Sequence, residues 1–269
     1  MPSVETDWLE LWRELVTAIT QTTSRQSMDR YETHFRKKTH ERPDPLLDFI
    51  LQDVENQSTV IDVGAGNGRW AIPIAKKAKD VTAVEPWDSR LNILRQNMAT
   101  ANLRNIHIVQ APWEEALVEP HDIIVCAHTA STNPEFAAFI RKMERHTKKR
   151  CYLAVSLPPR NGIIGKLSLS IYGHSYDSPN AIIAYNALYS IGIYANMLVE
   201  EDIYHWVDST FEKAFARAKR HLRLESSAAH DKLIRDTLSH HLTYTDNLYL
   251  WPDGIRSALL WWNPSPVSR

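Results

Sequence analysis

The chain has 269 residues, which is enough for one large hydrophobic core or two small ones. Apolar residues make up 43% of it and charged residues 23%, which excludes a wholly disordered or collagen-like chain. The 31 lysines and arginines nearly balance the 32 aspartates and glutamates, so no global positive field exists to hold a nucleic-acid backbone, although a local basic patch stays open.

The number of cysteines and the lengths of the apolar runs indicate the cellular compartment of the protein. The two cysteines, Cys126 and Cys151, are too few for a disulfide scaffold or a structural zinc site, and they fit a reduced setting. The 12 histidines show no spacing typical of metal ligands, so we expect no metal site. No apolar run approaches the ~20 residues that span a bilayer, and the N-terminus shows no signal segment. We therefore expect a cytoplasmic protein without a membrane segment.

The first part of the chain shows the spacing of apolar residues that is typical of helices. Between residues 6 and 20, apolar side chains recur on one helical face, and residues 26–38 favour a second helix with a basic end. Two prolines end this second helix, and a short helix follows them. We expect residues 1–57 to form an N-terminal helical cap.

From residue 58, short apolar runs alternate with helical stretches, which predicts a parallel sheet with helices on both faces. The strands expected in this part are residues 59–63, 81–84, 106–110, 122–127 and 151–156. The helices expected between them are residues 69–79, 88–101 and 134–148.

The remainder of the chain is less regular. Helical additions are expected in residues 157–193 and 207–243. Two further strands are expected at residues 194–200 and 256–262, the second after a turn at residues 252–254. Neither repeats nor linkers are visible. This favours a single domain over residues 1–269, with its core in residues 58–200 and 256–263.

The most informative segment is VIDVGAGNG, residues 60–68, which contains the end of the first expected strand. Glycines let the main chain approach a ligand without a Cβ clash, and the first turn of the following helix offers unpaired N–H groups. Glu85 ends the next strand, 85 − 64 = 21 residues after Gly64. A carboxylate there can accept two hydrogen bonds from the vicinal hydroxyls of a ribose. The pattern therefore predicts an adenosine-type ligand.

Two classes of nucleoside-binding fold use such an arrangement. Dinucleotide-binding folds need a small third residue in G-x-G-x-x-G/A, where this chain has Arg69. The chain instead reads D-x-G-x-G-x-G from Asp62, with an acid at the end of the next strand. This motif resembles that of the class I S-adenosylmethionine-dependent methyltransferases, over about residues 30–200 and 256–262.

The resemblance implies a fold and a cofactor. The fold is an α/β, Rossmann-like sheet of about seven strands with the last strand antiparallel. Helices cover both faces, with an N-terminal helical cap and a helical insertion before the last strand. The implied chemistry is that of an enzyme which takes a methyl group from S-adenosylmethionine and releases S-adenosylhomocysteine.

The resemblance also implies cofactor contacts. The glycine loop would line the methionine part and the ribose, the aspartate before it would reach the ammonium group, and the glutamate would hold the ribose diol. The proline and tryptophan after that glutamate would flank the adenine, although simple packing of the tryptophan is an alternative. These residues are Asp62, Gly64, Ala65, Gly66, Asn67, Glu85, Pro86 and Trp87.

After the third strand the family usually carries an acidic or polar side chain that reads the adenine amine. Proline stands at that position here, so we expect Trp113 to stack on the adenine, with Glu114 or backbone groups reading its edge. Packing of Trp113 at the sheet edge is the alternative. Ala127 and His128, at the end of the fourth strand, would lie beneath the sulfonium.

His128 is the candidate general base, because histidine titrates near neutral pH. The alternative is a strand-end histidine bonded only to backbone. Methyl transfer from a sulfonium needs mainly alignment and exclusion of water. From the N-terminal helices, Tyr31 and Arg36 are candidates to hold the cofactor carboxylate, unless the basic run is an ordinary solvated helix end.

We expect a small-molecule acceptor, because the charge is nearly balanced and polar-aromatic segments at residues 157–160 and 172–176 suit a pocket lid. Three alternatives remain. The first is an RNA or protein acceptor, against which stands C-A-H-T at residues 126–129 in place of an N-P-P-[YF] tetrapeptide. The others are a non-catalytic cofactor-binding scaffold and, disfavoured by Arg69, a nicotinamide oxidoreductase. The oligomeric state stays open.

Overall fold

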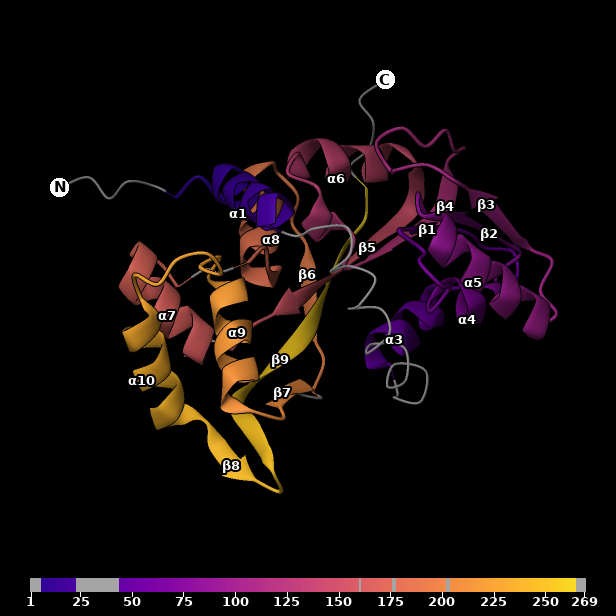
Figure 1. Ribbon diagram of the computed structural model, residues 1–269. Coiled ribbons are helices and arrows are strands. Elements are labelled where there is room, and N and C mark those ends of the chain that lie inside the picture. Colours follow the sequence, from indigo (N-terminus) through magenta and orange to yellow (C-terminus); the bar gives the residue numbers. More distant parts are fainter. Residues whose placement is uncertain (1–5, 23–43, 160, 176–177, 202–203, 265–269) are drawn as a thin grey trace.

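One central sheet with helices on both faces organises the molecule, as Figure 1 shows. The computed structural model describes residues 6–22, 44–159, 161–175, 178–201 and 204–264. The helix expected at residues 26–38 lies outside these ranges. None of the described helices is both long and apolar enough to cross a bilayer.

The strand order in the sheet is β3-β2-β1-β4-β5-β9-β6. The first five strands are parallel, and β9 runs antiparallel between β5 and β6. This order confirms the predicted α/β, Rossmann-like sheet with its antiparallel last strand. The strands are β1 (Thr59–Val63), β2 (Asp80–Val84), β3 (Ile106–Val109), β4 (His121–Ala127), β5 (Thr147–Leu157), β6 (Asn196–Val199) and β9 (Leu248–Trp262).

The inner strands are apolar because helices cover both of their faces. β1 and β2 each bury every residue after the first, as parallel strands between two helical layers do. One layer is formed by α3 (Pro45–Asp53), α4 (Ala71–Ala75) and α5 (Asp88–Thr100). The other layer is formed by α1 (Trp8–Thr22), α6 (Phe136–Arg145) and α8 (Ala181–Ser190).

Helix α1 is fastened to the segment after β4. The Trp12 side chain is fully buried, its Nε1 donates to the backbone oxygen of Asn133 at 2.9 Å, and its ring centroid lies 4.4 Å from that of Phe136. Arg13 adds an ion pair to Glu135 at 3.1 Å. The N-terminal helix is thus packed next to the short 3-10 helix η1 (Ala130–Thr132), which follows the end of β4.

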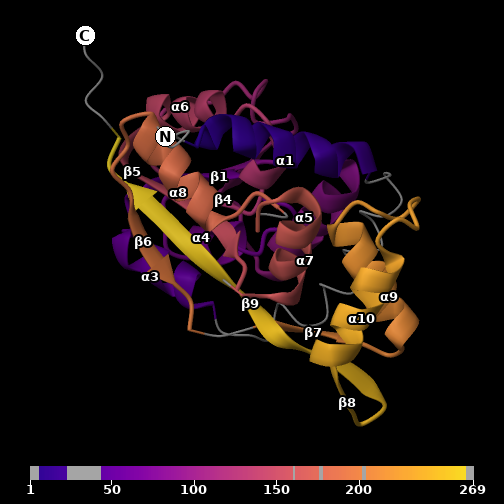
Figure 2. The ribbon, with the colours of Figure 1, turned by 90° about the vertical axis from the view of Figure 1, so that its left-hand side faces the viewer.

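The C-terminal addition, residues 163–172 and 204–255, builds a separate hydrophobic cluster. Its buried Asp208 accepts two hydrogen bonds from Arg217, at 2.9 and 2.8 Å, and one from Nε1 of Trp251 at 2.9 Å. Figure 2 shows β9 running from this addition into the central sheet, so one strand joins both parts. Its elements are α7 (Ile163–Tyr172), β7 (Tyr204–Asp208), α9 (Phe211–His221), α10 (Asp231–His241), β8 (Thr243–Thr245) and the first part of β9.

The sequence-based strand count of about seven is too low. The described residues form nine strands, because β7 and β8 pair with the first part of β9. That strand begins at Leu248 rather than residue 256, and the turn expected at residues 252–254 lies inside it. Turn-forming residues are tolerated there because the β7–β9 pairing is irregular: His205 pairs with Gly254 and Val207 with Leu250, so residues 251–253 lie in a bulge. The helix expected at residues 69–79 is also shorter, Ala71–Ala75, because the preceding residues form turns.

Candidate functional site

The glycine loop lies at the carboxyl end of β1, where parallel α/β sheets bind ligands. Gly64 and Gly66 have φ angles of 73° and 55°, a region that favours glycine. A Cβ at Gly64 would lie 1.9 Å from Oγ1 of Thr129, so this glycine is required for packing. A Cβ at Gly66 would meet nothing nearer than the Gly64 oxygen at 3.9 Å. Gly66 therefore borders open space that a ligand can enter.

Glu85 connects the end of β2 to this loop. Its side chain is 1% exposed, and its Oε2 accepts a hydrogen bond from the Gly66 N–H at 2.9 Å. Its Oε1 accepts from the Trp87 N–H at 3.1 Å, and Arg90 lies 3.8 Å from Oε2. Since each carboxylate oxygen has two lone pairs, Glu85 can hold the loop and accept further hydrogen bonds from a diol.

Asp62 is a buried carboxyl in β1 with an unsatisfied oxygen. It is 2% exposed, and its Oδ2 has no hydrogen-bond partner among the described residues. Desolvation, followed by the nearby Glu85, raises the pKa of Asp62 to about 7, while a hydrogen bond from the Ala71 backbone opposes the shift. Buried polar atoms are rarely left unpaired. The arrangement thus suits a donor or cationic group that arrives with a ligand, such as an ammonium.

His128 follows β4 in a left-handed backbone conformation with φ 59°. Its backbone N–H donates to the oxygen of Ala154 at 2.9 Å, and Ser131 Oγ donates to its carbonyl at 2.7 Å. His128 is exposed as a residue, and the protein around its imidazole still desolvates the ring. This desolvation and the nearby Arg69 guanidinium lower the pKa of His128 below its ordinary value, against an opposing effect of Asp44. The imidazole is therefore neutral at pH 7.

Trp87 and Trp113, which were both expected to contact the adenine, differ in their exposure to solvent. Trp87 is 39% exposed at the start of α5, next to the partly exposed Pro86, so both border the site at Glu85. Trp113 is only 4% exposed, and its Nε1 donates to the backbone oxygen of Phe139 in α6 at 3.3 Å. This burial favours the packing alternative for Trp113. Glu114 is exposed beside it.

The other predicted residues of the glycine loop also hold it in place. Ala65 is buried, and its N–H donates to the Val84 oxygen at 3.0 Å. The backbone oxygen of Asn67 accepts from Nδ2 of Asn97 in α5 at 2.8 Å. Ala127, the last residue of β4, lies half-buried beside His128. Tyr31 and Arg36 lie outside the described residues, so their roles stay predictions.

Sequence analysis missed an ion pair that braces the loop. Arg69 lies 2.7 Å from Oδ2 of Asp44, and Nε1 of Trp70 donates to the same oxygen at 2.8 Å. The other oxygen of Asp44 caps α3 by accepting from the Leu47 N–H at 3.1 Å. An aspartate directly before a proline at a helix start is a capping signal that would have located Asp44. Nothing in the sequence shows that Arg69 reaches it.

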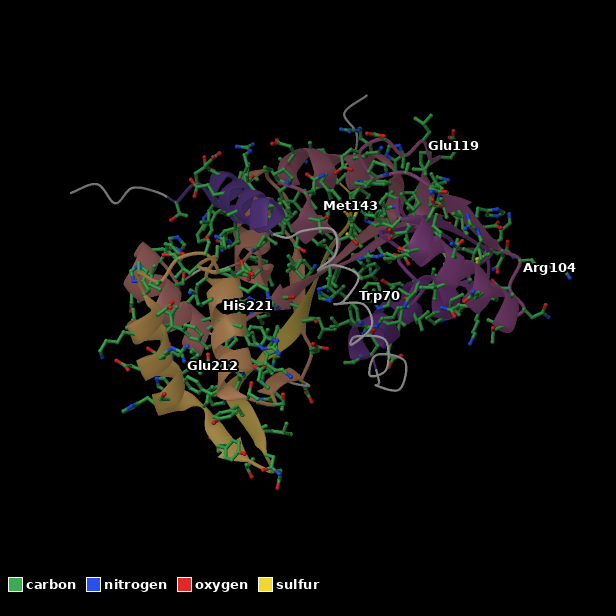
Figure 3. All side chains as sticks on the ribbon, in the orientation of Figure 1. Trp70, Arg104, Glu119, Met143, Glu212 and His221 are labelled. Carbon is green, nitrogen blue, oxygen red and sulfur yellow. The ribbon has the colours of Figure 1, made fainter. Side chains whose placement is uncertain are left out.

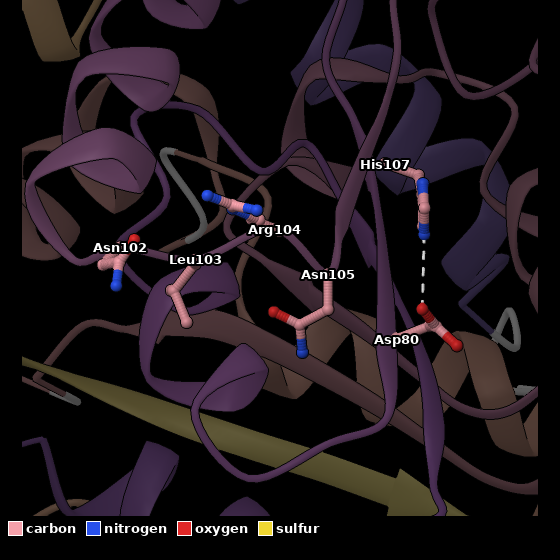
Figure 4. Close-up of a pocket in the computed structure, with 6 residues that line it drawn as sticks. All are labelled: Asp80, Asn102, Leu103, Arg104, Asn105 and His107. Atoms are coloured by element: carbon pink, nitrogen blue, oxygen red, sulfur yellow. Dashed lines mark hydrogen bonds and ion pairs between the residues drawn. The ribbon is translucent and has the colours of Figure 1, made fainter.

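The hollow drawn in Figure 4 is not part of this site. It is lined by residues at the amino ends of β2 and β3, opposite the glycine loop, and Figure 3 shows Arg104 at the outer edge of the molecule. It contains a hydrogen bond between Nε2 of His107 and Oδ1 of Asp80 at 3.3 Å. Across the described ranges, no three potential metal ligands gather into a metal site.

Comparisons with known proteins agree with this geometry. Residues 60–150 match a family model described as a methyltransferase domain. The probable ribosomal RNA small subunit methyltransferase A of Methanosphaera stadtmanae is 38% identical over 69 residues, which are 25% of this chain and 26% of that protein. The ubiquinone biosynthesis O-methyltransferase of Acinetobacter baylyi is 29% identical over 105 residues, which are 38% of this chain and 44% of that protein.

A solved structure shows the same fold over most of the chain. The YcgJ protein from Bacillus subtilis superposes with a TM-score of 0.56 at 15% identity, covering 82% of this chain and 98% of that one. The match at residues 60–150 and the shared fold agree with the predicted resemblance to the class I S-adenosylmethionine-dependent methyltransferases. The matched segments span less than half of the two curated relatives.

The contact between Gly64 and Thr129 gives a first prediction. We expect Gly64→Ala to lower the free energy of unfolding by ~1–3 kcal/mol more than Gly66→Ala does. The reason is that a methyl group at residue 64 would overlap Thr129, whereas one at residue 66 would overlap no neighbour. Urea denaturation measures both. The double variant Gly64→Ala/Thr129→Gly should recover part of the loss. If it recovers none, the overlap does not explain the requirement for glycine.

The raised pKa of Asp62 gives a second prediction. The folded-state pKa of about 7 lies above the ordinary value of 3.8, so the folded state binds this proton more tightly than the unfolded state. The contribution of Asp62 to stability is therefore fully present below the ordinary pKa and is lost as pH rises to about 7. Asp62→Asn cannot ionise. Its free energy of unfolding, relative to the parent, should rise between about pH 4 and pH 7 and then level off. If the free energies of unfolding of the parent and of Asp62→Asn change with pH in the same way, this prediction is wrong.

Proposed function

We propose that this protein transfers the methyl group of S-adenosylmethionine to a small-molecule acceptor by in-line displacement. The observation that carries the proposal is the meeting of three groups at one strand end. These are the open Gly66 turn, the Glu85 carboxylate that accepts its N–H, and the unsatisfied buried oxygen of Asp62. The first suits close approach of a ligand, the second a ribose diol, and the third an ammonium group.

The residues of the chain have separate tasks in this proposal. Glu85 binds the ribose hydroxyls, Asp62 pairs with the ammonium group, and Trp87 and Pro86 border the adenine. When bound, the cofactor supplies an electrophilic methyl group on its sulfonium. The neutral His128 at the end of β4 accepts the proton that the acceptor loses as it is methylated. Most of the rate then comes from holding the two reactants in line and away from water.

The nearly balanced charge of the chain supports a small acceptor, because 31 lysines and arginines against 32 aspartates and glutamates give no global positive field for RNA. An RNA acceptor is the second candidate, because the relative from Methanosphaera stadtmanae is named for ribosomal RNA. Binding to RNA that weakens steeply with salt would favour it. The buried, free thiols of Cys126 and Cys151 fit the expectation of a reducing cytoplasm.

The role of Glu85 is tested by ligand affinity. We expect Glu85→Ala to weaken S-adenosylhomocysteine binding at least ~30-fold in calorimetry, because two charge-assisted hydrogen bonds to the ribose are lost. Asp80→Ala is the matched control, since it removes a carboxylate from the other end of β2 and should leave affinity unchanged. Equal affinity of Glu85→Ala and the parent would reject the proposed cofactor site.

The role of His128 is tested by rate. With an acceptor that the parent protein methylates, His128→Asn should lower kcat by ~100-fold or more while S-adenosylhomocysteine still binds. Release of S-adenosylhomocysteine measures turnover. The parent kcat/KM should fall only at pH values below the ordinary range of histidine, because the pKa of His128 is lowered. Unchanged turnover in His128→Asn would show that His128 is not the base.

A further inference from the structure

A side chain from the last strand reaches His128. The Oγ of Ser257 in β9 lies 3.5 Å from Nε2 of the His128 ring. Among the described residues, it is the side chain that hydrogen-bonds this imidazole. The two residues are 129 positions apart in sequence. They meet because β9 inserts beside β5, the strand next to β4.

Ser257 is itself held firmly. Its N–H donates to Oε1 of Glu200 at 2.5 Å, and the Glu200 N–H donates to the Ser257 oxygen at 3.0 Å. In the β5–β9 ladder Ser257 pairs with Ser156, which places it within a continuous run of paired residues. A hydroxyl on such a backbone has little freedom beyond rotation about χ1. It is therefore suited to orient a neighbouring ring.

The backbone at His128 is equally constrained. The left-handed conformation of His128 is strained for a non-glycine residue and persists only where its surroundings enforce it. Here the enforcing contacts are the hydrogen bond to Ala154 and the packing of Thr129 over Gly64. The same turn thus links His128 to the proposed cofactor loop on one side and directs its ring to β9 on the other.

We propose that Ser257 is a positioning residue that accepts a hydrogen bond from Nε2–H of His128 and so leaves Nδ1 as the nitrogen that receives the acceptor's proton. This inference rests on the proposed function. In the step, a lone pair of the acceptor bonds to the methyl carbon while the carbon–sulfur bond breaks and its electrons stay on sulfur. The acceptor's proton moves to Nδ1, and the imidazolium later returns it to water.

The charged groups around the ring are compatible with this assignment. Arg69, before α4, and Asp44, at the start of α3, both act on His128, but they pair with each other at 2.7 Å. Glu200 lies behind Ser257 and bonds its backbone N–H. As the imidazole becomes positive, its hydrogen bond to the Ser257 oxygen strengthens, because bonds from charged donors are the stronger ones.

The tautomer of His128 is the direct test, and it needs no acceptor. In protein with ¹⁵N-labelled histidine and bound S-adenosylhomocysteine, the His128 signals, assigned by their loss in His128→Asn, should show a protonated Nε2 and an unprotonated Nδ1. Ser257→Ala should shift these signals toward a mixture of tautomers, and Ser257→Thr, which keeps the hydroxyl, should restore them. Ser156→Ala is the control and should leave them unchanged.

Kinetics give a second readout. With an acceptor that is methylated, Ser257→Ala should lower kcat by ~3- to 10-fold and move the acid limb of kcat/KM to lower pH, with Ser257→Thr restoring both. A protonated Nδ1 in the parent, or a tautomer that Ser257→Ala does not change, would overturn the positioning role. Either result would leave the proposed function intact. If the parent protein does not bind S-adenosylhomocysteine, the proposed function itself is rejected.

Discussion

The hydrogen bond between the Glu85 carboxylate and the Gly66 N–H is the interaction on which the candidate site depends. This hydrogen bond joins the end of β2 to the loop after β1. It therefore fixes the distance between the buried Glu85 carboxylate and the open turn at Gly66. Behind it, Asp62 carries an oxygen that nothing in the described protein satisfies. A buried acid pair of this kind is costly to fold, and it is explained if a ligand binds both carboxylates.

The rest of the site is assembled around that pair by packing. Thr129 fills the space over Gly64 and thereby fixes the turn that carries His128. Asp44 joins the start of α3 to Arg69 and Trp70 just after the loop. The last strand, β9, brings a hydroxyl to the imidazole from the far end of the chain. Catalytic geometry here is a consequence of how the sheet and its two helical layers pack.

Local patterns in the sequence were sufficient to predict the parallel sheet and the glycine loop. Five apolar runs, the glycine loop and Glu85 are short-range patterns, and the structure places each of these at the expected strand or strand end. The burial of Trp113 could not be predicted locally, because it depends on Phe139 and Lys142 from the later helix α6. Ser257 and the β7–β9 pairing depend on contacts between distant segments, which no local pattern encodes.

A crystal structure of the complex with S-adenosylhomocysteine tests the central claim most directly. The account predicts both ribose hydroxyls within about 2.6–3.2 Å of the Glu85 oxygens, and the amino group beside Oδ2 of Asp62. A nucleoside bound away from the carboxyl ends of β1 and β2, with the Asp62 oxygen still unpaired, would contradict it.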